Sequence, residues 1–225
     1  MKKARFLRLV TAAVLGLTGA GSQLSAGEIL QELNPGQQSQ VKKGEQILLT
    51  DEVEGKPWPR VTIYQVVDAT PEEVAAVFFD YEDNKSFVPN ILKSSISKKI
   101  TACTTEIDYG VNVPILPDEF YTARNTIKML SPDHYRVDWK LVRAVHTKDS
   151  VGSFCMEPFE GKTLIRYQNL VTPGSSMAGL LRKTAISQMK DAATAIATRA
   201  EKLKTANPAQ LNKQVEALRA ALKAG

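Results

Sequence analysis

The 225-residue sequence contains few of the residues that most often carry reactive chemistry. It has two cysteines and two histidines, and it lacks a glycine-rich phosphate loop of the G-x-G-x-x-G or Walker type. His134 and His146 fall at predicted turns, and neither belongs to a cluster of histidine, cysteine and acidic residues at metal-ligand spacing. No run reaches the roughly 18 uncharged apolar residues of a spanning helix, which excludes a multispanning membrane protein. We therefore expect no metal, no cofactor and two histidines at the surface.

The scarcity of cysteine limits disulfide bonding to one pair, Cys103 with Cys155. An oxidising compartment would permit that bond. In a simple antiparallel meander, however, two strands would separate the strands that carry these residues. At about 4.8 Å per strand, this distance exceeds the roughly 7 Å that a disulfide spans between Cα atoms. We predict two buried free thiols, with a disulfide as the alternative if the sheet closes strongly.

Acidic residues are absent from the first 27 positions, whereas basic residues are concentrated there. The four basic residues are Lys2, Lys3, Arg5 and Arg8. A short apolar stretch over 9–17 follows, and Leu24-Ser25-Ala26 then supplies a small residue before a cut. This layout is typical of a secretory signal peptide cleaved after Ala26, and an uncleaved anchor is the alternative. We predict that residues 1–26 are a signal peptide and that the protein is periplasmic or otherwise extracytoplasmic.

The basic residues of the predicted signal peptide account for most of the net positive charge, which would otherwise suggest a polyanionic partner. The formal net charge is +5, and cleavage after Ala26 would remove four positive charges and leave about +1. We therefore expect no nucleic-acid partner. The basic residues that remain on one face of the predicted strands are expected to be a solvated surface, with contact to anionic lipid headgroups as the alternative.

With 43% hydrophobic and 24% charged residues, the remaining chain has enough apolar material for a globular core. Apolar and polar residues alternate in segments separated by turn residues. The predicted strands cover residues 60–67, 92–100, 103–111, 119–130, 135–144, 150–157 and 163–172, with 46–53 as a further candidate. Their connections are too short for crossover helices, so the strands should form an antiparallel meander.

Helical patterns surround these strands. Thr70-Pro71-Glu72-Glu73 combines a capping hydroxyl with proline at the first helical position. Residues 174–205 carry one long apolar stripe. We predict an α+β helix-grip fold, in which a curved antiparallel sheet of six to seven strands wraps a long C-terminal helix. The expected parts are a lead-in segment at 27–45, a ligand-binding domain at 46–205 and a short amphipathic helix at 206–225, which is expected to be an appendage rather than part of the core.

The apolar face of the predicted sheet also contains polar groups. These residues are Gln65, Asn125, Arg143 and Asn169, beside Tyr109, Trp139 and Tyr167. In a dry core each unsatisfied polar group would cost about 1–3 kcal/mol. We predict that they line a partly wet cavity between sheet and helix and orient the polar end of a ligand, with Arg143 as the main contact. Alternatively, they hydrogen-bond one another or lie near strand ends.

The loop at 111–117 is apolar and contains two prolines, Pro114 and Pro117. Beside a cavity mouth it could act as a lid or as a membrane-docking tip. The alternative is that it packs under the N-terminal segment.

Several short motifs together resemble the START-like, or helix-grip, superfamily, and most closely its bacterial polyketide-cyclase/coenzyme Q-binding branch. They are Pro57-Trp58-Pro59-Arg60-Val61, Val67-Asp68-Ala69-Thr70-Pro71-Glu72-Glu73-Val74, Phe79-Asp80-Tyr81 and Phe87-Val88-Pro89-Asn90. The resemblance spans about residues 45–203. It implies a deep apolar cavity for lipids, sterols, isoprenoids or polyketides, and only some branches of the superfamily are enzymes.

These observations lead to the hypothesis of an exported, non-enzymatic protein that carries a hydrophobic ligand, such as a lipid, an isoprenoid or quinone, or a sterol-like molecule. No catalytic residue is assigned, and transient membrane contact is expected during delivery. The alternative is a cyclase- or dehydratase-like enzyme acting on a polyketide- or lipid-like substrate in the same cavity. A third hypothesis is an interaction module that uses the helix at 207–225. The oligomeric state is left open.

Overall fold

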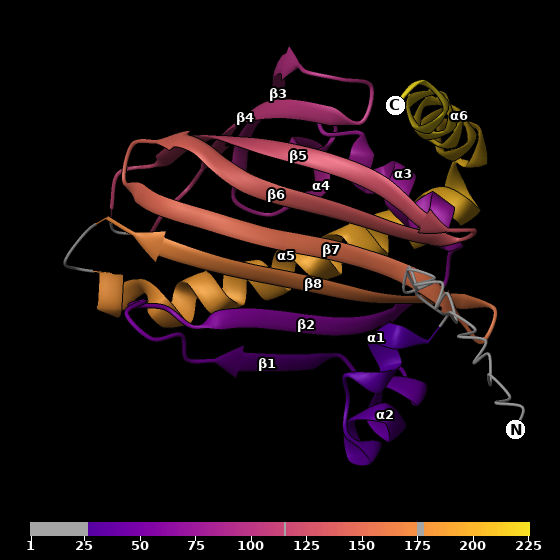
Figure 1. Ribbon diagram of the computed structural model, residues 1–225, viewed down its shortest axis with the longest axis horizontal. Helices are drawn as coiled ribbons and strands as arrows, with labels where there is room; N and C mark the ends of the chain where they lie inside the picture. Colours follow the sequence, from indigo (N-terminus) through magenta and orange to yellow (C-terminus); the bar gives the residue numbers. More distant parts are fainter. Residues whose placement is uncertain (1–26, 115, 175–177) are drawn as a thin grey trace, which may run out of the picture.

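The computed structural model describes residues 27–114, 116–174 and 178–225, which form an antiparallel sheet wound around a long helix (Figure 1). The predicted signal peptide lies outside the described residues, as do Ile115 and residues 175–177. The strands are β1 (Ile47–Asp51), β2 (Arg60–Val67), β3 (Ile91–Lys99), β4 (Thr104–Val111), β5 (Glu119–Ser131), β6 (His134–Ala144), β7 (Thr147–Phe159) and β8 (Lys162–Pro173). The helices are α1 (Glu28–Gln31), α2 (Pro35–Lys42), α3 (Pro71–Phe79), α4 (Asn84–Phe87), α5 (Ala178–Ala206) and α6 (Pro208–Ala224).

The strands lie in the order β1-β2-β8-β7-β6-β5-β4-β3, and every neighbouring pair is antiparallel. The meander predicted from the short connections is therefore confirmed for β3 to β8. The sheet has eight strands rather than six to seven, because β1 pairs with β2 over residues 47–51. As an edge strand, β1 has a neighbour on one side only. The other edge strand, β3, carries two register shifts and the exposed lysines Lys93, Lys98 and Lys99.

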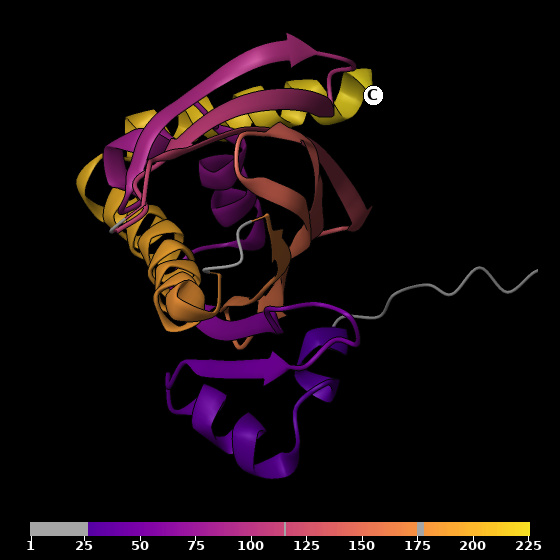
Figure 2. The same cartoon turned by 90° about the vertical axis from the view of Figure 1, so that its left-hand side faces the viewer.

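The predicted long helix is α5, which runs across the concave face of the sheet (Figure 2). Its buried stripe contains Ala193, Ile196, Ala197, Ala200 and Leu203. These residues recur at helical spacing, so a single face of α5 contacts the core. The helix-grip architecture expected from the one-sided apolar sheet is confirmed.

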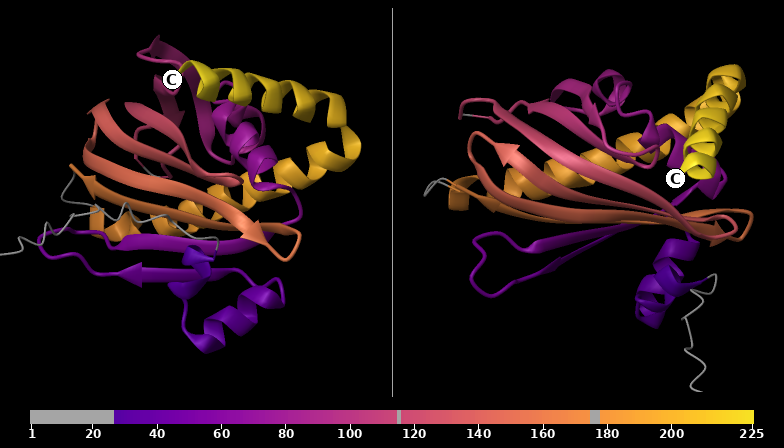
Figure 3. Two further views of the ribbon diagram at one scale, coloured as in Figure 1. Left: turned by 45° about the vertical axis from the view of Figure 1, so that its right-hand side comes forward. Right: turned by 45° about the horizontal axis from the view of Figure 1, so that its top comes forward.

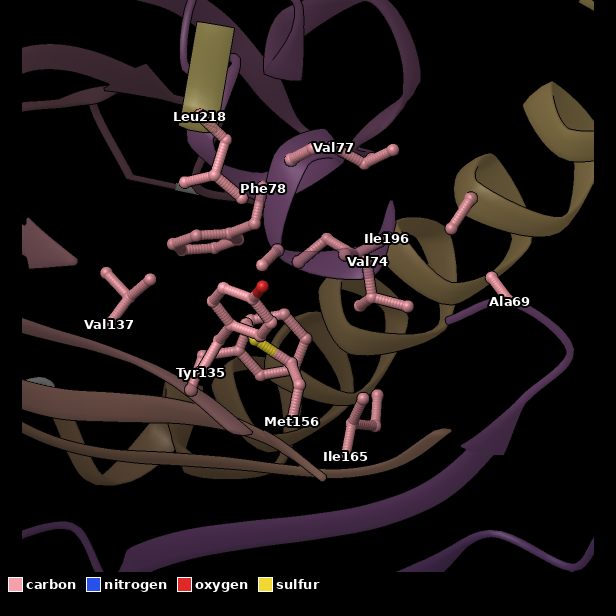
Figure 4. Close-up of a cluster of buried hydrophobic side chains, with 14 of the residues drawn as sticks. Ala69, Val74, Val77, Phe78, Tyr135, Val137, Met156, Ile165, Ile196 and Leu218 are labelled. Carbon is pink, nitrogen blue, oxygen red and sulfur yellow. The ribbon is translucent and has the colours of Figure 1, made fainter. Parts of the chain in front are cut away.

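The main core lies where α3 is inserted between the sheet and α5 (Figure 4). The helix begins with the predicted cap, in which the Thr70 hydroxyl accepts a hydrogen bond from the Glu73 amide and the Glu73 carboxylate accepts one from the Thr70 amide. Phe78 lies within 5.2 Å of the Phe154 ring, measured between centroids. Burial of these aromatic residues fixes the position of α3 over the sheet.

The C-terminal helix α6 was expected to be an appendage, and this prediction is wrong. Leu211, Val215 and Leu218 are buried in the same core cluster as α3, and Figure 3 shows α6 alongside α3. Arg219 and Glu72 form a two-point ion pair at 2.6 Å, and Gln214 donates a hydrogen bond to Asp80 at 2.8 Å. Because the apolar face of α6 is covered by α3, it does not offer a free docking surface.

The lead-in segment covers part of the outer, convex face of the sheet, which we expected to be solvated. Ile29, Leu33 and Val41 are buried there against Cys155 and Leu164. This small second core explains why the outer register of β7 and β8 contains apolar residues. Figure 2 shows α1 and α2 beside β1 and β2, on the side of the sheet away from α5.

Both cysteines are free, as predicted. Cys155 is buried and Cys103 is half-buried, so the expectation of two fully buried thiols holds for only one of them. Burial raises the pKa of both thiols. The expectation of two surface histidines is wrong for His134, which is 3% exposed at the start of β6, and burial lowers its pKa.

The described residues lack two features that other classes of protein use. No helix in them is long and apolar enough to cross a membrane. In the same part of the chain, no group of three or more histidine, cysteine, aspartate or glutamate side chains is placed to hold a metal ion.

Candidate ligand-binding site

A cavity of about 470 Å³ lies between the concave face of the sheet and the first half of α5. Its walls come from the ends of β4, β6 and β8, the starts of β3, β5 and β7, and the loop after β4. Apolar side chains form much of this surface, including Val111, Leu116, Leu141, Val171, Leu181 and Met189. The volume falls within the range of about 300–1,000 Å³ typical of small-molecule sites.

A smaller chamber of about 120 Å³ adjoins this cavity on the side of α3. The two spaces share Tyr121, Tyr167, Asn169 and Ala192 in their walls. The chamber combines aromatic residues with polar uncharged groups and contains no lysine, arginine, aspartate or glutamate among its lining residues. The two spaces together form an apolar cavity that leads to an uncharged polar inner end.

The hydrogen bonds between the polar groups of the inner chamber are long. Asn169 accepts from the Trp139 indole N–H at 3.4 Å and from the Ser150 hydroxyl at 3.5 Å. Asn125 donates to the Tyr109 hydroxyl, also at 3.5 Å. Good hydrogen bonds measure about 2.7–3.2 Å when N–H donates to oxygen and about 2.5–3.0 Å when O–H does. These groups are therefore only weakly paired with one another and retain capacity to bind a ligand.

Glycine at position 152 makes room for the Trp139 ring. Gly152 is the direct cross-strand neighbour of both Trp139 and Asn169, and a Cβ atom there would lie 2.3 Å from the indole ring. The ring consequently extends across the strand and reaches Tyr167, with the two ring centroids 5.2 Å apart. Gly152 thus sets the shape of the chamber wall.

Burial keeps the tyrosines of the site in their neutral form. It raises the pKa of Tyr109 to about 12, although hydrogen bonds from neighbouring side chains oppose the shift. Burial also raises the pKa of Tyr121 and Tyr167. Near neutral pH their hydroxyls are therefore hydrogen-bond donors rather than phenolate bases.

The structure brings together five of the seven predicted site residues. Asn125, Asn169, Tyr109, Tyr167 and Trp139 all line the inner chamber. Their role in binding stays a prediction. Strand alternation located them correctly because none of them is preceded by a bulge in its own strand.

Arg143 is not part of the cavity, which corrects the prediction of it as the main ligand contact. Its side chain is 73% exposed, and on the outer face it donates to the Thr122 hydroxyl at 2.9 Å and lies near Asp108. The cause is a bulge in β6, where Thr122 pairs with Arg143 but Ala123 pairs with Leu141. The extra residue, Val142, reverses the alternation and turns Arg143 outward.

Gln65 also lies outside both the cavity and the chamber. Its side-chain oxygen accepts a hydrogen bond from Gln46 at 2.8 Å, and Gln46 also donates to Thr194 of α5. Gln65 therefore helps to join β2 to α5. Its partner is therefore not one of the polar groups that the sequence analysis placed on the apolar face.

Glu119 is a cavity residue that the sequence analysis missed. The residue is 8% exposed, and its carboxylate accepts hydrogen bonds from the Val145 amide at 3.0 Å, the His146 amide at 3.1 Å and the Thr147 hydroxyl at 3.1 Å. These bonds hold the β6–β7 turn at the cavity mouth, where His146 is also placed. Its inward register, two residues before Tyr121, was a signal that could have identified it.

The described residues of the loop after β4 line the cavity mouth, and none of them belongs to the core cluster that residues 29–41 form with the sheet. Val113, Pro114, Leu116 and Pro117 contribute to the cavity wall. Asn112 donates to Asp118 at 3.0 Å across the base of the loop. Gln188 of α5 donates to the Asn112 carbonyl at 3.3 Å and so links the loop to the helix.

Comparison with known proteins shows the fold of the chain. No family model matches the sequence, and no curated protein matches it. A fragment of a STAR-related lipid transfer protein from Xanthomonas axonopodis matches with a TM-score of 0.60 and 16% identity, covering 69% of this chain and 98% of that one. The Zhui aromatase/cyclase from Streptomyces sp. R1128 matches at 0.57 and 13%, covering 65% and 96%. Human STARD10 matches at 0.54 and 16%, covering 78% and 85%. The chain has the START-like helix-grip fold.

These neighbours correct one functional expectation. The sequence analysis expected a non-enzymatic protein, but the structures that share this fold include several aromatase/cyclases. Enzymes therefore occur among proteins of this fold, and the fold by itself does not exclude catalysis.

Proposed function

We propose that this protein is exported and binds a hydrophobic ligand with an uncharged polar end in the cavity between the sheet and α5. The observation that carries the proposal is the pairing of an apolar cavity of about 470 Å³ with an inner chamber lined by amide, hydroxyl and aromatic groups. Apolar burial would supply most of the affinity, at about 25 cal/mol per Å². Asn125, Asn169 and the neutral tyrosine hydroxyls would bind a hydroxyl or carbonyl group.

The uncharged lining of the inner chamber favours a ligand without a formal charge. A carboxylate or phosphate in the inner chamber would lose its hydration without meeting a cation, which is strongly unfavourable. Isoprenoid alcohols, quinones and sterol-like molecules combine an apolar body with a neutral polar group and fit this environment. The STAR-related neighbour carries lipid transfer in its name, which supports a carrier role.

Ligand chemistry is tested by mass spectrometry and by a matched pair of probes. Protein purified from its own compartment should release a neutral, apolar molecule on solvent extraction. Hexadecanol should bind about tenfold or more tightly than palmitate, which has the same chain length and a charged end. Both tryptophans, Trp58 and Trp139, line the site, so intrinsic fluorescence reports binding directly. An empty protein that binds neither probe, or one that prefers palmitate, would contradict the proposal.

The cavity mouth also supports transient membrane contact. Three large apolar side chains that are sequence neighbours of cavity residues are exposed, Phe120 at 48%, Val145 at 64% and Leu180 at 77%, and the apolar loop after β4 lines the cavity. A surface of this kind is typical of membrane or protein contact. Replacing Val145 and Leu180 with serine should reduce co-sedimentation with lipid vesicles while hexadecanol affinity stays unchanged.

The second candidate function is cyclisation or dehydration of a polyketide- or lipid-like substrate in the same cavity. The cluster of Tyr109, Tyr121 and Tyr167 favours it, because neutral hydroxyls can donate to a carbonyl oxygen as negative charge develops there. Aromatase/cyclases share the fold. A poly-β-ketone substrate incubated with the protein should give cyclised products by mass spectrometry, and Tyr167→Phe should slow their formation. Equal product profiles with heat-denatured protein would exclude this activity.

A further inference from the structure

Glu157 of β7 is a carboxylate buried where no function proposed above uses it. The residue is 0% exposed, and it faces the outer side of the sheet beneath α1. Its Oε2 atom accepts a hydrogen bond from the Ile29 amide at 3.1 Å. Its Oε1 atom has no hydrogen-bond partner within the described residues, and none of the ion pairs found in that part of the chain includes Glu157. A buried charge without a cationic partner is unusual and unfavourable.

The backbone nitrogen of Gly27 is one of the groups that face this carboxylate. The backbone amides of Ile29, Leu30 and Gly27 favour the charged form of Glu157, while burial, the largest effect, raises its pKa overall. Gly27 precedes the first turn of α1 with a φ of 102°, a left-handed conformation that glycine adopts without strain. It is also the residue that follows the expected leader cleavage site.

We propose that cleavage after Ala26 creates an α-ammonium group on Gly27 that forms an ion pair with the buried carboxylate of Glu157. Hydrolysis of the Ala26–Gly27 peptide bond by a signal-processing peptidase consumes one water, leaves a carboxylate on Ala26 and leaves the ammonium on Gly27. The neutral amide at position 27 is thereby replaced by a cation at the same nitrogen. This inference rests on the export part of the proposed function and is independent of the ligand.

The ion pair would fasten α1 to the outer face of the sheet after processing. The segment already contributes Ile29 and Leu33 to the outer core. Its Glu32 pairs with Arg166 and accepts a hydrogen bond from the Tyr64 hydroxyl at 2.8 Å. Before processing, the partners of the buried carboxylate within the described residues are backbone amides alone. Removal of the leader therefore completes the packing of the outer face, and the processed chain is the more stable form.

The first experiment determines the N-terminus and the effect of its charge. Intact mass and N-terminal sequencing of the exported protein should place Gly27 first. A chain beginning at Gly27 contains all described residues, and it is compared in its free form with its Nα-acetylated form, in which a neutral amide replaces the ammonium group. The free form should melt several degrees higher at pH 7, since each 1 kcal/mol shifts the melting temperature of a domain of this size by about 2–4 °C. In Glu157→Gln this difference should disappear, whereas the exposed control Glu45→Gln should keep it.

A second measurement does not depend on whether Glu157→Gln folds. The α-amine of the unaltered protein is labelled by reductive ¹³C-methylation and titrated by NMR. The pairing predicts a pKa above the usual range of about 7.7–8.0 for an α-amine. The charged group that acts on Glu157 besides the amine is Glu28 on α1. Glu28 also acts on His134 of β6, which has Arg136 and Arg166 as its further charged neighbours.

Three results would overturn the inference. They are an N-terminus other than Gly27, equal melting temperatures for the free and acetylated chains, and an acetylation effect that persists unchanged in Glu157→Gln. Ligand extraction from the same samples separates the two proposals. A processed protein that contains ligand but shows no acetylation effect would refute the ion pair and leave ligand binding supported.

Discussion

Filling the inner chamber should separate ligand binding from stability. Ala192 of α5 lies in the walls of both the cavity and the chamber. In Ala192→Phe, the new ring would point into the chamber of about 120 Å³. The protein should fold normally, because the ring occupies existing space, but the ligand would lose the polar inner end of its site.

The volume of the chamber sets the expected change in stability and in ligand affinity. Empty cavity volume costs about 24 cal/mol per Å³, so complete filling of the chamber would stabilise the protein by at most about 3 kcal/mol. A ligand excluded from the same volume would lose a comparable amount of binding free energy, which corresponds to about 100-fold in affinity. The substitution should therefore raise the urea midpoint and weaken hexadecanol binding together.

The assay is a fluorescence titration with hexadecanol, with urea unfolding of the same samples. Thr198→Phe, which adds the same ring at an exposed position of α5, should leave the affinity unchanged. Wild-type affinity in Ala192→Phe would refute the assignment of the chamber as the inner end of the ligand site. Equal loss of affinity in both variants would show that an added ring on α5 acts without filling the chamber.

Three further predictions follow from the corrected features. Arg143→Ala should change hexadecanol affinity by less than about twofold, since this side chain lies on the outer face; a large loss would place it back in the site. Leu218→Ala should lower the free energy of unfolding by about 2–4 kcal/mol in urea, whereas Leu180→Ala, at a 77% exposed residue, should cost less than about 0.5 kcal/mol; equal costs would contradict the packing of α6. Burial holds the pKa of His134 below its ordinary value of 6.5, so the unfolded chain binds more protons and stability falls as pH drops from 6.5 toward the folded pKa. His134→Gln should lose less stability than the wild type between about pH 7.5 and 5, and equal losses would refute this assignment.

Strand alternation predicted much of the concave face, because the two-residue period and burial on one side are both local properties of a strand. It failed at Arg143, because a single extra residue, Val142, reverses the period and nothing in the residue types marks the bulge. The volume of the site depends on packing between distant strands. At Gly152, for example, the absent side chain matters only because Trp139 lies beside it.

The errors at the two ends of the chain have a different cause. The pattern of Leu211, Val215 and Leu218 predicted a helix, but it contained no information about α3 as the partner of that helix. Similarly, Ile29 and Leu33 were too few to indicate that α1 covers the outer face. Amphipathic segments can be identified locally, whereas the surface that they cover comes from another part of the sequence.

The edge strand β3 has a consequence for how copies of the protein behave together. An exposed sheet edge presents unpaired amides and carbonyls to which a second sheet could add a strand. Here Lys93, Lys98 and Lys99 line an edge that two register shifts make irregular. Addition of a second copy would bring like charges together along a strand of mismatched spacing. We therefore expect concentrated solutions of this protein to resist edge-to-edge aggregation through β3.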